Sequence, residues 1–488
     1  MPLTALIAVM AGLTAPAVAQ PPATAASASA PAAARALARV TDAVDGPADA
    51  QDVTLALRDL RRHRAGLAGA DRRQADRLLS RPRTGRVRCS TAPAVCVHWS
   101  ASGADRATRA YAGRVLRVAG HVLGTYAAAG YRAPLPDGAR GGSNALDIYL
   151  QDIGRQGYYG WCDSDAPAGG TGSLGAPAYC VFDNNYREFP VHTPLENLQV
   201  TAAHELFHAV QFAYDYNEDA WFMEATATWA EDEVYTDVND NLQYLPQSPL
   251  AQPGRSMDQF LQTGFRQYGD WIFFRYLTER FPAAEGGLPT LVRSIWERAS
   301  AGTGSSEYSM RAVREVLAAQ GTPLPAVWAG FVAANRRPWL TYAEGAANRY
   351  PSARLAGGVK LTAAHRRSGP VTTTVDHLAG ATLRFTRAAD LAARTLRVQL
   401  TLPKAALGSG AVVTVKTTSG RPVSTPVKLA ADGTATVAEP FGSDVSWVEV
   451  SLANAGTRYR CWHGTDWSCQ GRPLDDNRSF TVAVRARR

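Results

Sequence analysis

Two kinds of hydrophobic spacing divide the chain. Apolar residues recur every three or four positions over 194–214, with Leu198, Leu206 and Val210 among them, and this spacing predicts a long amphipathic helix. Further helical patterns cover residues 224–234, 268–281, 289–298, 310–319 and 324–335. Short runs of apolar and β-branched residues precede them at 86–89, 95–99, 145–150 and 177–182. Residues 86–350 are therefore expected to form one domain of mixed α and β structure.

The pattern changes near Tyr350–Gly357. Beyond this point apolar and polar residues alternate in short runs that are separated by Gly, Asp and Pro, mostly about ten residues apart. Alternation with a period of two is typical of half-buried strands. Residues 357–488 are therefore predicted to form an all-β, sandwich-like domain.

The first 85 residues contain three further segments. Residues 1–19 are apolar and uncharged and end in Ala17-Val18-Ala19, which predicts a signal peptide and a secreted protein. Residues 20–50 are rich in Ala and Pro, and we expect a disordered linker there. Over 51–85, leucines recur among Arg and Asp, which predicts a pair of short helices. These helices belong either to a removable pro-region or to an N-terminal hairpin packed on the domain.

Composition narrows the function classes. Of the 488 residues, 46% are hydrophobic and only 19% are charged, which argues against a mostly disordered chain. After the N-terminus no run of about 20 apolar residues appears, so no transmembrane segment is expected. The net charge of +8 comes from arginines scattered among acidic residues without a basic block. Nucleic acid is therefore not expected to be a partner.

Six cysteines fall into three close pairs along the chain. Six cysteines allow 15 connectivities, of which pairing between sequence neighbours is the simplest. None of the pairs has the C-x-x-C spacing of a zinc ribbon or a thioredoxin-like site. We therefore expect the disulfides Cys89–Cys96, Cys162–Cys180 and Cys461–Cys469, which form in an oxidising compartment. The alternative is a set of buried free thiols.

The segment His204-Glu205-Leu206-Phe207-His208 lies within the longest predicted helix. Residues four apart lie on one face of a helix, so both imidazoles can reach a single metal ion. Glu205 is turned by about 100° around the helix axis, which places its carboxylate beside the metal, where it can act on a water molecule. The spacing therefore predicts one catalytic Zn²⁺, with Glu205 as the general base.

A third ligand is needed, because a catalytic zinc has three protein ligands and one open position. Glu224 lies 16 residues beyond His208, far enough for the chain to reverse and bring a second helix back to the metal. Glu231 follows on the same helical face, two turns later. It is either a hydrogen-bond partner of a ligand histidine or a plain surface acid.

These residues resemble the gluzincin group of zinc metallopeptidases, which includes thermolysin-like proteases and one-zinc aminopeptidases. The first segment matches their H-E-x-x-H pattern, and Met223-Glu224-Ala225-Thr226-Ala227 is similar to their N-E-G-x-A box, with Met and Ala in place of Asn and Gly. Over residues 86–345 the chain also resembles secreted bacterial proteins described as metalloproteases.

The resemblance carries expectations about the fold and the site. It implies an α+β metallopeptidase domain with a small mixed sheet, the motif helix and a helical lower lobe. It also implies an edge strand above the zinc that binds an extended peptide, for which the candidates are Tyr179, Val181 and Phe182; the alternative is an ordinary sheet strand. A tyrosine on a downstream helix would stabilise the oxyanion, and Tyr268 is the candidate; otherwise Tyr268 is a packing residue.

The leading hypothesis is therefore an exported zinc peptidase whose partner is a peptide or protein substrate. Two alternatives come from other classes. One is a binding protein that retains zinc without turnover. The other is a protein that contacts an extracellular surface or a glycan through its C-terminal β domain.

Overall fold

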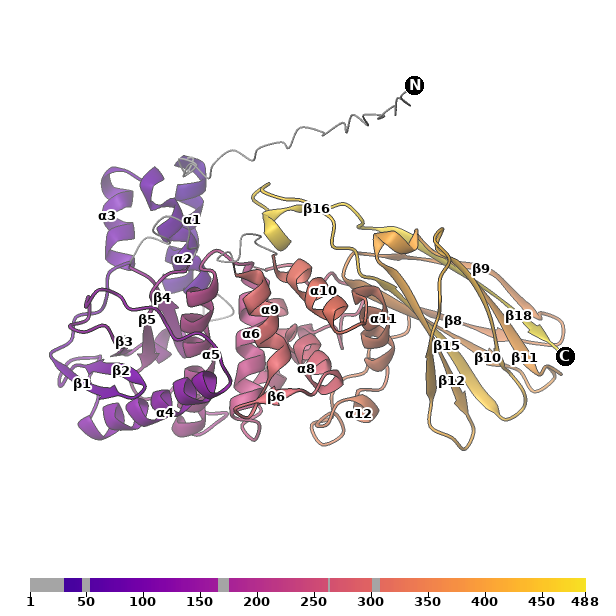
Figure 1. Cartoon of the computed structure of the whole chain (residues 1–488), viewed down its shortest axis with the longest axis horizontal. Coiled ribbons are helices and arrows are strands. Elements are labelled where there is room, and N and C mark those ends of the chain that lie inside the picture. The colour runs from indigo at the N-terminus through magenta and orange to yellow at the C-terminus, as the bar shows by residue number, and fades with distance from the viewer. Residues whose placement is uncertain (1–29, 46–52, 166–174, 262–263, 301–307) are drawn as a thin grey trace, which may run out of the picture.

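The computed structural model describes residues 30–45, 53–165, 175–261, 264–300 and 308–488 (Figure 1). The predicted signal peptide over residues 1–19 lies outside these ranges. The described chain is mixed α and β, with several sheets and a β-rich C-terminal region.

The N-terminal part forms three helices, α1 (Ala30–Asp45), α2 (Val53–His63) and α3 (Gly69–Leu78). The two helices expected over 51–85 are confirmed. The linker expected over 20–50 is wrong for residues 30–45, which are helical. Alanine has the highest helix propensity, and Ala33, Leu37 and Val40 form a buried stripe on α1. The small alanine side chains make this buried face hard to recognise from the sequence.

A five-stranded sheet follows, with the strand order β1-β2-β3-β5-β4. Its strands are β1 (Arg86–Thr91), β2 (Ala94–Trp99), β3 (Leu146–Gln151), β4 (Gly160–Asp163) and β5 (Tyr179–Asp183). Strands β2, β3 and β5 run parallel, whereas β1 and β4 are antiparallel to their neighbours. Strand β4 therefore forms one edge of a mixed sheet.

Both faces of this sheet are covered. Helix α4 (Arg109–Ala128) packs on β1 and β2, and α5 (Pro194–Tyr214) packs on β4 and β5. Side chains that alternate along the strands point to opposite faces. Ile148 and Phe182 lie in the hydrophobic core between the sheet and helices α4 and α5, whereas Tyr149 and Val181 pack with α1–α3 on the other face. This alternation along each strand thus gives three layers: α1–α3, the sheet, and α4 with α5.

A helical lobe follows the sheet and lies beside it in Figure 1. It comprises α6 (Ala220–Val234), α7 (Arg266–Gly269), α8 (Trp271–Arg280), α9 (Thr290–Ala299), α10 (Ser309–Ala319), α11 (Leu324–Ala334) and α12 (Pro338–Thr341). Large aromatic side chains fill its core, including the fully buried Trp221, Trp229, Trp271 and Trp296.

The C-terminal region contains two larger sheets that share a buried aliphatic core. One has the order β13-β12-β15-β10-β8 and the other β14-β11-β18-β9. Their strands are β8 (Gly357–Leu361), β9 (Arg367–Val375), β10 (Ala379–Arg387), β11 (Thr395–Thr401), β12 (Ser409–Thr417), β13 (Val423–Pro426), β14 (Thr434–Pro440), β15 (Val445–Asn454) and β18 (Arg478–Arg487). Strand β8 begins at Gly357, so the change of structure falls at the predicted boundary.

The three expected disulfides are confirmed: Cys89–Cys96, Cys162–Cys180 and Cys461–Cys469. The first two join directly opposed residues of neighbouring strands, β1 with β2 and β4 with β5. Across the described residues no single helix has the length and apolar character needed to cross a bilayer; α10 and α11 pass that test as a pair but are bent by 100°.

The β region is held to the helical lobe by a buried histidine. His377, in the turn between β9 and β10, lies 2.7 Å from Asp258 through Nε2 and 3.1 Å from Asp476 through Nδ1. Tyr459 donates a hydrogen bond to the second oxygen of Asp258 at 2.6 Å. Burial would lower the pKa of His377, but the two carboxylates outweigh burial and raise it to about 9.

The raised pKa makes this contact sensitive to alkali. The stabilisation is complete below pH about 6.5, where the histidine is protonated even in the unfolded chain, and it disappears as the pH rises through about 9. The corresponding free energy is roughly 3 kcal/mol. We expect the free energy of unfolding of the native chain to fall over this range, whereas that of His377→Gln should fall much less. Denaturant titrations from pH 6 to 9.5 measure both, with the exposed His365→Gln as the control. Parallel curves for the native chain and His377→Gln would contradict this assignment.

Candidate metal centre

Two neighbouring helices carry the candidate ligands. Helix α5 begins with a capping box, in which the Thr193 hydroxyl accepts from the Glu196 N–H and the Glu196 carboxylate accepts from the Thr193 N–H. Five residues, 215–219, separate α5 from α6, so the two helices pack against each other along their length. This hairpin brings His204 and His208 on α5 to the face of Glu224 on α6.

The three residues converge as the sequence predicts. Their candidate ligand atoms all lie within 4.8 Å of one another, and the group could hold a metal ion. His204 Nε2 lies 3.1 Å from His208 Nε2 and 3.1 Å from Glu224 Oε2, and His208 Nε2 lies 3.2 Å from Glu224 Oε1. All three side chains are buried, and Glu224 is 0% exposed.

The opposite nitrogen of each ring has a fixed partner. Glu231 Oε1 lies 2.6 Å from His204 Nδ1, so the hydrogen-bonding alternative for Glu231 is the correct one, and a surface acid is excluded. Gln211 Oε1 lies 2.7 Å from His208 Nδ1. Gln211 Nε2 donates to Met223 O at 2.9 Å and to Thr226 Oγ1 at 3.0 Å, which fixes the orientation of the amide.

These contacts determine where the protons lie. The Gln211 oxygen can only accept at this position, and so can Glu231 in its ionised form, so each histidine then carries a proton on Nδ1. In the neutral ring, Nε2 then presents a lone pair. Two lone pairs and the carboxylate of Glu224 face one another across about 3 Å, and Glu224 Oε1 has no hydrogen-bond partner. Burial lowers the pKa of His204, but Glu224 and Glu231 outweigh burial and raise this pKa well above its ordinary value. The positive charge that the group favours can therefore come from a proton on His204 or from a metal ion, and the donor set suits a metal ion.

The surrounding charges agree with this arrangement. Burial alone would raise the pKa of Glu224, but His208 and His204 outweigh it and hold this pKa well below its ordinary value. Burial raises the pKa of Glu231 to about 7, against the opposing effect of His204. Glu224 is therefore the ionised carboxylate of the centre, and Glu231 supports His204.

Glu205 lies in the same cavity, which has a volume of about 320 Å³ and is also lined by His204, His208 and Glu224. The residue is 6% exposed, and burial raises the pKa of its carboxyl group. Gly160 on β4 lies against it: a Cβ at this position would stand 3.0 Å from Glu205 Cγ and 2.8 Å from Thr201 Cγ2. Glycine thus allows the edge strand to approach the helix that carries Glu205.

The expected substrate strand is corrected by the sheet order. Tyr179, Val181 and Phe182 lie on β5, which pairs with β3 on one side and β4 on the other, so this strand has no free edge. The edge strand is β4, which none of the predicted apolar runs covers. The two residues after Gly157 are aromatic, and Gly160 and Trp161 begin the strand.

Helix α2 covers part of this edge. The Cys162 N–H of β4 donates to Thr54 Oγ1 at 3.1 Å, and the Thr54 hydroxyl donates to Glu205 Oε2 at 3.4 Å. Arg61 of the same helix forms an ion pair with Asp163 at 2.6 Å. An extended peptide could pair with Cys162 only after Thr54 moved away. This contact cannot be predicted from local sequence patterns, because Thr54 and Glu205 are 151 residues apart.

Tyr268 lies at the centre as expected, although its helix is shorter than predicted. It belongs to α7, and its ring stacks on His204 with a centroid distance of 5.8 Å and an interplanar angle of 22°. Tyr244 stacks on its other side at 5.0 Å, and both tyrosines line the cavity. Tyr268 therefore packs against His204 and also faces the cavity, an arrangement that agrees with either of its two expected roles.

The turn between α5 and α6, residues 215–219, is held by hydrogen bonds to residues that lie away from the candidate metal ligands. Asp219 stands at the N-cap position of α6, but its side chain makes no capping hydrogen bond. Its carboxylate instead accepts from Ser309 Oγ at 2.6 Å and from the Cys469 N–H at 2.8 Å. The helical lobe and the disulfide loop of the C-terminal region therefore position the helix that carries Glu224.

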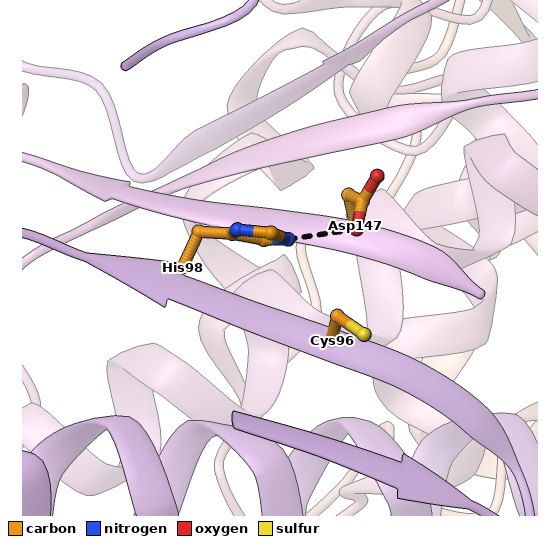
Figure 2. Close-up of side chains that lie close together, drawn as sticks. All are labelled: Cys96, His98 and Asp147. Atoms are coloured by element: carbon orange, nitrogen blue, oxygen red, sulfur yellow. Dashed lines mark hydrogen bonds and ion pairs between the residues drawn. The ribbon is translucent and has the colours of Figure 1, made fainter. Parts of the chain in front are cut away.

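A second group with suitable residue types is Cys96, His98 and Asp147 (Figure 2). Cys96 is oxidised in its disulfide with Cys89 and has no thiolate to offer. His98 Nε2 lies 2.8 Å from Asp147 Oδ1, and Arg81 occupies Asp147 Oδ2 at 2.6 Å. Both oxygens of Asp147 are thus already paired, one with His98 and one with Arg81, so we interpret the group as a structural contact between β2 and β3.

Comparisons with known proteins assign no family. No family model matches the chain, and no curated protein matches it. Among solved structures, the pre-peptidase C-terminal domain of a collagenase from Bacillus anthracis is 7% identical and covers 27% of this chain and 97% of its own, with a TM-score of 0.17. A mutant of a periplasmic inhibitor of g-type lysozyme from Escherichia coli is 11% identical and covers 27% and 96%, with a TM-score of 0.16. A GH115 4-O-methyl-α-glucuronidase is 9% identical and covers 73% and 53%, with a TM-score of 0.13. These likenesses are too weak to indicate a function.

Gln211 provides a test of the metal centre. Replacing it with leucine removes the acceptor that holds the Nδ1 proton of His208, so we expect the affinity for Zn²⁺ to fall by about 10- to 100-fold. Competition with a chromophoric chelator measures this affinity. Gln199→Leu, a half-buried change on the same helix, is the matched control and should bind like the native chain. Equal affinities of all three proteins would show that Gln211 does not orient a ligand.

Proposed function

We propose that the chain is an exported zinc-dependent peptidase. The observation that carries the proposal is the convergence of two imidazole nitrogens and one carboxylate oxygen beside the carboxylate of Glu205, with each imidazole held by a second buried group. Two nitrogen donors and one oxygen donor, with a cavity in front of them, fit a catalytic zinc better than a closed structural site. The three disulfides support export to an oxidising compartment.

The donor set also favours zinc among metals. Imidazole suits zinc, copper, iron and nickel, whereas calcium and magnesium prefer oxygen ligands alone. Zinc bound by His204, His208 and Glu224 would lower the pKa of a water molecule and polarise a carbonyl group. The three ligands would take no part in proton transfer, because their remaining polar atoms are engaged with Glu231, Gln211 and one another.

Glu205 would carry out the proton transfers. It would accept a proton from the attacking water and then deliver that proton to the nitrogen of the leaving amine. Burial raises its pKa, which suits a group that must both take up and release a proton. The Thr54 hydroxyl beside Glu205 Oε2 and the backbone of Gly160 would limit the positions that the carboxylate can adopt.

Tyr268 is the best-placed group to stabilise the developing oxyanion. It lines the cavity, and its ring is stacked between His204 and Tyr244, which restricts its motion. A phenol O–H held beside the reacting carbonyl would donate a hydrogen bond as negative charge develops there. The substrate would be a peptide segment that enters the cavity between β4 and α7.

Glu205→Gln distinguishes a peptidase from a protein that only retains zinc. The amide preserves the size of the side chain but cannot accept the proton of water, so we expect hydrolysis of casein to fall by roughly 10²- to 10⁴-fold. The zinc content should stay at one ion per chain, because the metal ligands are unchanged. Glu188→Gln, at an exposed position, is the control and should retain full activity.

Two results would contradict the proposal. One is a Glu205→Gln variant that cleaves casein at the native rate. The other is a native chain that holds zinc yet hydrolyses neither casein nor a mixed peptide library, which would indicate a zinc-retaining binding protein.

A further inference from the structure

The outer face of the second C-terminal sheet carries a row of arginines. Arg397 on β11 lies directly opposite Arg485 on β18, and Arg485 lies directly opposite Arg367 on β9. Opposed residues of neighbouring strands point to the same face. Leu396 and Val484, which flank this row, are buried in the core, so the three arginines face outward.

This arrangement is unfavourable for the isolated domain. Like charges directly opposite one another on neighbouring strands are destabilising. The guanidinium of Arg367, together with Arg487, Arg366 and Arg397, lowers the pKa of the Arg485 side chain. None of the three aligned arginines forms an ion pair with a carboxylate of the described residues, and Arg397 Nε has no hydrogen-bond partner.

Arginines at the other sheet of the same region, one on β10 and two that follow helix α11, have a carboxylate partner. Arg336, Arg337 and Arg384 all converge on the buried carboxylate of Glu449, at distances of 3.2, 2.6 and 2.6 Å. Those arginines neutralise a carboxylate of the chain itself, whereas the row on the second sheet lacks such a partner among the residues described. An anion from outside the chain would supply one.

The surroundings of the row enlarge the positive surface. Next to Arg485, at one end of the row, a groove of about 660 Å³ is also lined by Arg366, Arg487 and Arg488, with Asp390 as its one carboxylate side chain. One oxygen of Asp390 accepts a hydrogen bond from the Ala363 N–H. Four guanidinium groups therefore border the groove against a single acidic side chain.

The remainder of the face offers uncharged hydrogen-bonding groups. Two residues beyond Arg397 comes Gln399, and then Thr401, which lies opposite Thr481 of β18. Thr481 in turn lies opposite Thr372 of β9. Amide and hydroxyl groups thus continue the arginine row on the same side of the sheet, which is the combination that sugar hydroxyls and acidic sugar substituents require.

Other polyanions fit this face less well. Proteins that bind single-stranded nucleic acid on a sheet stack the bases on aromatic side chains, and the strands β9, β11, β14 and β18 expose no large hydrophobic or aromatic residue. A membrane-binding surface usually adds apolar residues that enter the lipid, and these are missing from the same strands.

We propose that this face binds an acidic polysaccharide through its carboxylate or sulfate groups. Neighbouring strands are about 4.8 Å apart, so a chain that crosses them meets a guanidinium at each strand. The forked guanidinium group matches the oxygens of carboxylate and sulfate. This inference is independent of the metal centre, because the row lies on a sheet that supplies none of the candidate ligands.

The test uses the full chain and two probes, polygalacturonate for carboxylate and heparin for sulfate, with dextran as the neutral glycan. Binding is measured by retention on immobilised glycan at about 0.15 M salt and by elution with a salt gradient. The triple variant Arg367→Gln/Arg397→Gln/Arg485→Gln should bind at least one acidic probe about tenfold more weakly. The control Arg73→Gln/Arg77→Gln/Arg311→Gln removes the same charge from exposed positions on α3 and α10, away from this sheet, and should bind like the native chain.

Stability provides a second readout. The single variant Arg485→Gln relieves the repulsion in the row, so its melting temperature should equal or exceed the native value while its retention falls. Which probe is retained identifies the anionic group.

The proposal would be overturned by lack of native retention on both acidic probes, by equal losses in the two triple variants, or by retention on dextran alone. Tighter binding to single-stranded DNA or to anionic vesicles than to either polysaccharide would also overturn it.

Discussion

The candidate centre depends on two buried acceptors that fix the protons of two histidines. Glu231 and Gln211 hold the Nδ1 protons of His204 and His208, so both Nε2 lone pairs face inward toward Glu224. Without a cation, these lone pairs and the carboxylate would oppose one another in a buried site. Most of the local architecture can be understood as a means of keeping these groups in place around a positive ion.

The helices that carry these groups are held from several directions. The capping box fixes the start of α5, and the sheet covers one of its sides. The turn before α6 is bound by Ser309 and by the loop closed by Cys461–Cys469, while His377 joins the β region to Asp258. The C-terminal region therefore helps to position the helix that carries Glu224. The outer face of its second sheet takes no part in these contacts.

Local periodicity and residue spacing were sufficient to predict the two-part fold, the disulfides and the convergence of His204, His208 and Glu224. They left open whether Glu231 supports a histidine. Gln211 was recognisable in principle, because it follows His208 by three residues on the same helical face. Thr54 and Gly160 were not, since their contacts with Glu205 join segments far apart in the chain. Strand β4 was missed because its glycine, which permits the close approach to α5, resembles loop composition. Helix α1 was missed because alanine contributes to both linkers and tightly packed helices.

The central claim is that a metal ion lies between His204, His208 and Glu224. X-ray data collected on crystals of the zinc-loaded chain, above and below the zinc absorption edge, test it most directly. The account predicts one anomalous peak, about 2.0–2.1 Å from both Nε2 atoms and bonded to a Glu224 oxygen. A zinc-loaded crystal without a peak at this position, in which protons alone link the two imidazoles and the carboxylate, would contradict it.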